Sequence, residues 1–192
     1  MLHLDTQIHD GVKVSVGLRN SFDKSMSAGG VLGEGVLVCD NMSFGGAEHS
    51  WMTLRRHTRN ILSDLPNRMR ELIAGLDPYV KSRRQFHDGL SQQTVTDSMF
   101  NDLLIDSIDR GSIGWRDAPV ALNTWRAREG VEYQGERINW DDGKDTAWRA
   151  FNAFTWALKR GFTAGNSDIA ANKTIKLNQQ FTNRFVDTKV PE

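Results

Sequence analysis

The spacing of apolar residues changes once along this chain, near residue 50, and that change constrains the fold. Up to about residue 44 the apolar residues alternate with polar ones or form short runs, as in β-strands. From about Ser50 they recur every three or four positions, as on one face of an α-helix. The sequence therefore predicts an α+β fold in a single domain, residues 1–192. Residues 1–44 would form a small β-sheet or hairpin, and about five α-helices would follow in residues 50–186.

Two strand signals stand out in the first 44 residues. Val12, Val14 and Val16 alternate with polar residues, which indicates a half-buried strand. The continuous apolar run at residues 36–39 predicts a strand buried on both faces. The glycine-dense segment at residues 28–35 leads into that strand and not into a helix. We therefore interpret it as a tight hairpin turn and not as a phosphate-binding loop.

The longest helical pattern starts near Ser50 and continues to Leu76. Pro66 lies inside it and must kink or split the helix, because proline cannot donate to the preceding turn. Asp77 followed by Pro78 marks a second boundary or kink. Its apolar stripe consists of Leu54, Thr58, Ile61, Leu65, Met69, Leu72, Ile73 and Leu76.

Shorter helical patterns follow, each with its own start and stop signals. One spans about 95–110, capped by Thr94 or Thr96 and ended by Gly111, and a short one opens at Pro119. Residues 129–144 are polar and contain three glycines, so we expect a loop there.

The two C-terminal helices are predicted at about 146–160 and from Ser167 onward. Asp145 or Thr146 would cap the first, and Gly161 would end it. Trp148 lies on its apolar stripe, whereas Trp156 lies off that stripe and should reach a second packing surface or a partner. The stripe of the last helix consists of Ile169, Thr174, Leu177, Phe181 and Phe185.

Charge alternates in four blocks along the chain, although the formal net charge is zero. Residues 51–86 carry eight basic and three acidic residues, and residues 87–145 carry six basic and twelve acidic ones. These blocks can build a bipolar surface or pair off on folding, and pairing is the usual outcome. No apolar run approaches the length of a membrane span, and Cys39 alone cannot form an intrachain disulfide. We therefore expect a protein of the reducing cytoplasm that meets no membrane.

Three stretches resemble a known family. They are residues 17–25 (GLRNSFDKS), residues 36–44 (VLVCDNMSF) with 56–58 (RHT), and residues 147–155 (AWRAFNAFT). In order and spacing they are similar to the phage/plasmid-like proteins of the domain family of unknown function 932. The resemblance implies a bacteriophage or plasmid origin, and it implies no established activity. Family members carry a longer portion before the segment at residues 20–25, so the chain resembles an N-terminally shortened member.

No pattern in the sequence predicts catalysis, a metal site or a cofactor. The five histidines lack ligand spacing, and a single cysteine excludes the cysteine-rich zinc patterns. Cys39 lies in an apolar run, where a thiol is ordinarily inert. We therefore expect a non-catalytic protein without metal or cofactor.

The most suggestive residues for function are basic and aromatic. Cations can follow a phosphate backbone while aromatic rings stack on bases. This favours a protein that binds or anneals single-stranded DNA, or binds another nucleic acid, and that acts as a homo-oligomer. Trp51 is the best candidate for an exposed platform on which a base could stack. Annealing proteins of phages share a comparable strand-then-helix layout, which is an analogy of fold alone. The candidate binding residues are Arg19, Lys24, Trp51, Arg55, Arg56 and Arg59.

Two alternatives remain open from the sequence. The acidic block at 87–145 and the six tryptophans would suit a protein that binds and inhibits a host defence or replication enzyme. A nuclease-like enzyme is the third hypothesis, and it would require His57, Asp40 and another carboxylate around one pocket.

Overall fold

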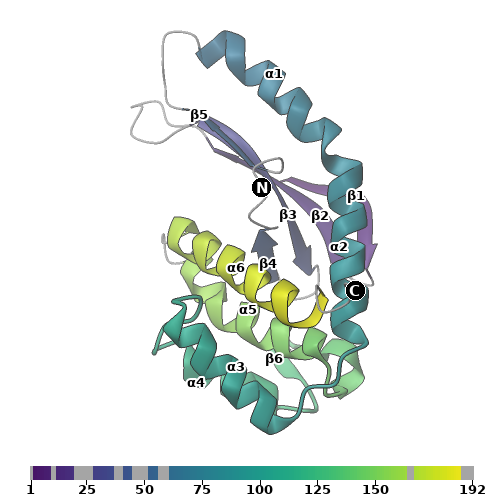
Figure 1. Ribbon diagram of the computed structural model, residues 1–192, viewed down its shortest axis with the longest axis vertical. Coiled ribbons are helices and arrows are strands. Elements are labelled where there is room, and N and C mark those ends of the chain that lie inside the picture. The colour runs from purple at the N-terminus through teal and green to yellow at the C-terminus, as the bar shows by residue number, and fades with distance from the viewer. Residues whose placement is uncertain are drawn as a thin grey trace, which may run out of the picture.

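The chain has the α+β fold that the apolar spacing predicts. The structure is a computed structural model that describes residues 2–9, 12–19, 28–36, 41–44, 52–55, 61–163 and 167–186. Within those ranges it contains two antiparallel sheets and six α-helices, arranged as Figure 1 shows. The prediction of an N-terminal sheet followed by helices is confirmed.

The larger sheet has five strands and is centred on β3. Strands β1 (Leu2–His9), β2 (Val12–Arg19) and β3 (Ala28–Val36) run antiparallel in sequence order. On the other side of β3, β4 (Asn41–Phe44) pairs with its second half and β5 (Met52–Arg55) with its first half. Val12 and Val14 are buried, as their alternation predicts.

The glycine-rich segment is a strand and not the hairpin turn that we expected. All of β3 pairs with its neighbours, and Gly33 lies between Ser15 of β2 and Phe44 of β4. Gly29, Gly30 and Gly33 are buried, so their missing side chains allow close packing on this strand. The strand expected at residues 36–39 begins with the last residue of β3, and 37–39 lie outside the described residues.

The long helix begins later than its apolar pattern suggested. Met52–Arg55 form β5, with Leu54 opposite Gly29, and α1 starts at Ile61. The expectation of a helix from Ser50 is therefore wrong for these residues. A four-residue segment fits either period, and the free edge of β3 decides in favour of the strand.

Helices α1 (Ile61–Ala74) and α2 (Leu76–Ser91) form one bent rod beside the sheet (Figure 1). Pro66 stays inside α1, and the break falls at Gly75. Pro78 lacks an N–H, so it cannot donate to the carbonyl of Ala74, and the chain bends at this point. The boundary predicted at Asp77 and Pro78 is thus close to the observed one.

The other helices are α3 (Asp97–Asp109), α4 (Ala118–Arg126), α5 (Ala147–Thr163) and α6 (Ser167–Phe181). Two predicted caps are present, because Thr96 Oγ1 accepts from Met99 N and Thr146 Oγ1 accepts from Arg149 N, each at 3.2 Å. Helix α5 passes through Gly161, so the predicted end there is wrong. A π-helical turn, Thr182–Val186, follows α6.

Residues 129–144 contain a hairpin where we expected only a loop. Strands β6 (Val131–Tyr133) and β7 (Glu136–Ile138) are joined by Gln134 and Gly135, both with positive φ. Such a turn usually carries Asn or Asp before the glycine, and a glutamine there gives a weak sequence signal. A short 3-10 helix, Trp140–Gly143, follows β7. Trp156 of α5 packs against Tyr133 and Trp140, which is the second packing surface predicted for it.

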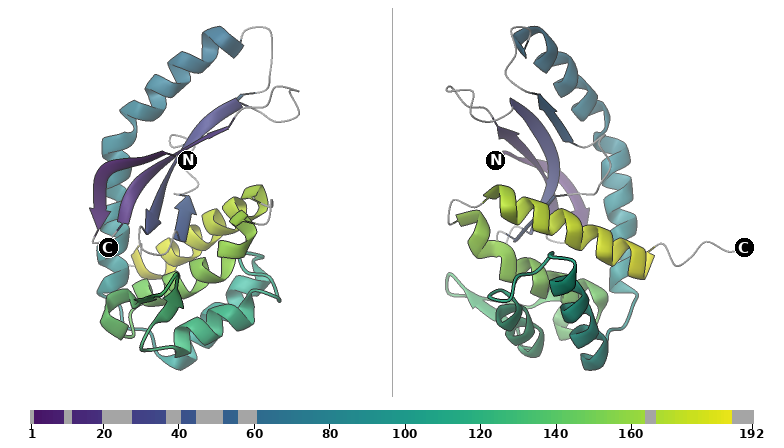
Figure 2. Two further views of the ribbon diagram at one scale, coloured as in Figure 1. Left: turned by 180° about the vertical axis from the view of Figure 1, so that it is seen from behind. Right: turned by 60° about the vertical axis from the view of Figure 1, so that its left-hand side comes forward.

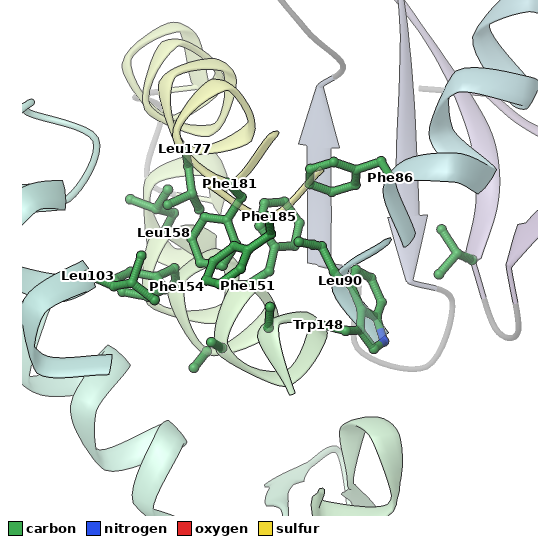
Figure 3. Packing of buried hydrophobic residues seen from close by; sticks show 14 of the residues in the cluster. Phe86, Leu90, Leu103, Trp148, Phe151, Phe154, Leu158, Leu177, Phe181 and Phe185 are labelled. Carbon is green, nitrogen blue, oxygen red and sulfur yellow. The ribbon is translucent and has the colours of Figure 1, made fainter. Parts of the chain in front are cut away.

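One hydrophobic cluster extends from the sheet to the C-terminal helices. Figure 3 shows its aromatic centre, where Phe86 of α2, Phe151 and Phe154 of α5, and Phe181 of α6 point toward one another. Figure 2 shows α5 and α6 lying side by side against the end of the sheet that holds β4. Two predicted stripe residues are exceptions, because Ile73 and Ile169 are exposed.

Candidate nucleic-acid interface

The predicted binding residues lie where the structure describes only part of the chain. Lys24, Trp51, Arg56 and Arg59 fall outside the described residues, as do His57 and Asp40 of the enzyme hypothesis. Arg19 is the last residue of β2 and Arg55 is the last residue of β5, and the backbone of both is described.

Strand pairing brings these two arginines to the same end of the sheet. Arg19 lies opposite Gly29, and Arg55 lies opposite Ala28, so both flank the start of β3 from its two sides. Neighbouring strands are about 4.8 Å apart, which puts the two arginine backbones about 10 Å from each other. Residues distant in sequence thus meet at one end of the sheet.

Helix α1 lies against β3 and β5 and carries two more arginines, Arg68 and Arg70 (Figure 2). Arg68 is half-buried and Arg70 is exposed, and Arg70 Nη1 donates to Asn67 Oδ1 at 2.6 Å. In the part of the chain that the structure describes, neither arginine forms an ion pair with a carboxylate. The same helix also carries Asp64 and Glu71, so the formal charge of α1 is zero.

The next two arginines of the basic block serve the fold. Arg84 Nε and Nη2 donate to the backbone carbonyls of Ile8 and Gln7 in β1, at 3.3 and 3.0 Å. Arg83 is buried and pairs with Glu34, in the middle of β3. Of these two cations, Arg83 is held in a buried ion pair, and Arg84 is bound to two backbone carbonyls.

Glu34, Arg83 and His87 form a buried charged junction between β3 and α2. Arg83 Nε donates to Glu34 Oε2 at 3.0 Å, and Arg83 Nη2 donates to Oε1. His87 Nε2 lies 2.9 Å from the same Oε2, and because an ionised carboxylate only accepts, Nε2 carries the hydrogen. The three side chains are between 0 and 4% exposed. Arg83 also lies over the ring of Phe86, with its Cζ 3.9 Å from the ring centroid.

Opposite charges decide the protonation of this junction. Burial raises the pKa of Glu34, but Arg83 and His87 outweigh it and hold that pKa at about 2. Burial lowers the pKa of Arg83, and the Glu34 carboxylate more than offsets this and raises it. Burial, with the Glu34 charge, raises the pKa of the neighbouring Tyr79. Glu34 is therefore ionised at neutral pH, and Arg83 and Tyr79 are protonated.

This junction holds the sheet to α2 and has no route to chemistry on a substrate, because all three side chains are buried. Sequence reasoning missed it, although a signal existed. Arg83 and His87 occupy the same helical face as Tyr79, Phe86 and Leu90, and a cation on an apolar stripe requires a buried partner. Glu34 shares the strand face of the buried Leu32.

Other ion pairs join blocks of opposite charge. Arg149 of α5 donates to Asp145 at 2.8 Å, and Lys173 of α6 donates to Asp117 at 2.8 Å. Together with Glu34 and Arg83, these pairs support the interpretation that the charge blocks pair off on folding.

No group of three or more His, Cys, Asp or Glu residues that could hold a metal ion occurs in the described ranges. None of the helices found there is both long enough and apolar enough to cross a membrane. Comparison of the chain with protein-family models, with curated proteins and with solved structures found no match.

Proposed function

We propose that the protein is a non-catalytic accessory protein of a phage or plasmid that binds or anneals single-stranded DNA as an oligomer. The observation that supports this is the pairing of β2 and β5 with the start of β3. It brings Arg19 and Arg55 to one end of the sheet, beside a helix that carries Arg68 and Arg70. Arg19 and Arg55 are thus neighbours in the sheet, and the helix with the other two arginines contacts β3 and β5.

Neighbouring arginines suit a phosphate backbone for two reasons. The guanidinium group keeps its charge and presents several N–H donors in one plane, which match phosphate oxygens. A set of cations that neutralises several phosphates also releases counterions, so the binding free energy depends on salt. Arg68 and Arg70 form no ion pair within the described residues, although Arg70 donates to Asn67 and the same helix carries Asp64 and Glu71.

The buried junction has a supporting part in this proposal. Glu34 lies on the strand that the two arginines flank, and Arg83 and His87 lie on α2, which continues α1. The ion pair and the hydrogen bond therefore fix the bent rod against the sheet. They hold α1 at the end of the sheet where Arg19 and Arg55 lie.

Fluorescence anisotropy of a labelled oligothymidylate tests the proposal at low and at moderate salt. Wild-type protein should bind at low salt, and its affinity should fall as salt rises. The double variant Arg19→Ala with Arg55→Ala should bind more weakly. Loss of two phosphate contacts should reduce the slope of log K against log salt by about 1.4.

Arg126→Ala is the matched control, because Arg126 is an exposed arginine at the end of α4. It should bind as wild type does. Size-exclusion chromatography with and without the oligonucleotide measures the expected oligomer. Absence of binding at low salt, or binding that is indifferent to salt, contradicts the proposal. Recovery of a stoichiometric host protein without nucleic acid would favour the protein-binding hypothesis instead.

A further inference from the structure

The outer face of α6 carries mainly donors and cations, and Asp168 in the first turn is the one acidic residue in the sequence of this helix. Asn172, Lys176 and Gln179 recur at steps of four and three, so they share one exposed face of the helix. Arg184 is exposed in the turn that follows. From residue 169 to residue 186, where the side chains are described, the sequence contains no Asp or Glu.

An exposed tryptophan lies in the loop beside this face. The loop at residues 110–117 runs along α6, since Lys176 Nζ donates to the Arg110 carbonyl at 3.4 Å and Lys173 Nζ pairs with Asp117 at 2.8 Å. Trp115 lies between these two contacts along the loop and is 79% exposed. We name Trp115, Arg116, Lys176 and Gln179 the α6 surface.

The charges around the α6 surface favour an anion. Asp117 is already paired with Lys173, and Asp106 is paired with Arg110. Arg116 is exposed and forms no ion pair among the described residues, and Asp109 is the exposed carboxylate at the start of the loop. Lys176 meets only a backbone carbonyl within the same ranges. The cations here remain able to bind a partner.

The kind of side chain distinguishes a nucleic acid from a protein partner. A protein interface centres on a contiguous apolar patch, whereas Ile169 is the one other large exposed apolar residue on α6 or this loop in the described ranges. Lys, Arg, Asn and Gln donate to phosphate oxygens and base edges. An exposed indole offers a flat face on which any base can stack. The α6 surface has these features together.

We propose that the α6 surface is a second contact site for single-stranded DNA, where a base stacks on Trp115 and phosphates bind Arg116 and Lys176. The site rests on the proposed function and extends it. A strand held at the sheet end meets a second set of contacts on the C-terminal helix. The site supplies stacking, which the arginines at the sheet end do not.

Two probes separate stacking from charge. Trp115→Ala should weaken binding to oligothymidylate by about 5- to 150-fold if one or more bases stack there. It should leave binding to an abasic oligonucleotide of the same length unchanged, since that probe keeps the phosphates and lacks the bases. Trp115→Phe should restore most of the affinity. An equal loss on both probes would overturn the stacking role.

Charge is tested by Arg116→Ala combined with Lys176→Ala. Loss of two phosphate contacts should lower the salt slope by about 1.4 on both probes. Lys81→Ala is the matched control, because Lys81 is an exposed lysine on α2. It should behave as wild type, and circular dichroism should show that all variants remain folded.

The outcomes separate this site from the proposed function. Suppose that the double variant of Arg19 and Arg55 binds more weakly than wild type, while both α6-surface variants bind as wild type does. That result overturns the second site alone. Wild-type protein that binds no oligonucleotide at low salt overturns both. If the affinity of the α6-surface variants falls as predicted, the second site is supported, whatever the affinity of the variant of Arg19 and Arg55.

Discussion

The junction between β3 and α2 and the outer face of α6 use the same kinds of side chain for opposite purposes. In the junction, Arg83 is buried against Glu34 and contributes to the fold. On α6, Lys176 reaches only a backbone carbonyl among the described residues and remains exposed. A count of charges along the sequence treats these cations alike. Burial and pairing therefore decide which charges are available to a partner.

The substitution with the largest expected effect lies in the buried junction. Arg83→Ala would leave the Glu34 carboxylate buried without its guanidinium partner. It should lower the free energy of unfolding by about 3–5 kcal/mol, measured by urea denaturation. The double variant Glu34→Gln with Arg83→Met removes both charges and should recover part of that loss.

Arg84→Ala is the control in the adjacent position. Arg84 is exposed and donates to two carbonyls of β1, so its loss should cost less than about 1 kcal/mol. Equal losses at Arg83 and Arg84 would show that burial does not distinguish the two arginines, and the comparison would fail.

Acid should weaken the same junction in a defined pH window. The pKa of Glu34 is about 2 in the folded protein, against an ordinary value of 4.5. A carboxyl group whose folded pKa is lowered stabilises the fold above its unfolded pKa. That contribution, on the order of 3 kcal/mol, disappears as the pH falls from about 4.5 to about 2.

Glu34→Gln isolates this contribution from that of the other carboxylates. The free energy of unfolding should be measured for both proteins by urea denaturation between pH 7 and pH 3. The gap in stability between wild type and Glu34→Gln should be widest near neutral pH and should shrink below pH 4.5. A gap that stays constant with pH would contradict the lowered pKa.

Local sequence signals predicted the helices better than the sheet. Thr96 and Thr146 cap α3 and α5 because a cap depends on residues only three positions apart. Strand β5 depends on the free edge of β3, which no local window contains. The same is true of β3 itself, where the pairing partners and not the glycines decide that the segment is extended.

The candidate sites follow the same division. A basic helix was expected to present Arg55 together with Trp51, whereas the backbone places Arg55 on a strand, near Arg19. That proximity follows from the strand register, which could not be predicted from the sequence alone. Trp115 was among six tryptophans with no local sign of exposure. Its exposure depends on how the loop at residues 110–117 packs on α6.

The substitutions with the smallest expected effect lie on the exposed α6 surface. Trp115→Ala and Lys176→Ala should each change the free energy of unfolding by less than about 0.5 kcal/mol, because neither side chain is packed in the core. Phe154→Ala in the same denaturation series should cost about 3–5 kcal/mol, since that ring is buried at the centre of the aromatic cluster. A large loss at Trp115 that grows with protein concentration would mean that a second copy of the chain covers it. The exposed surface would then belong to the oligomer and not to DNA.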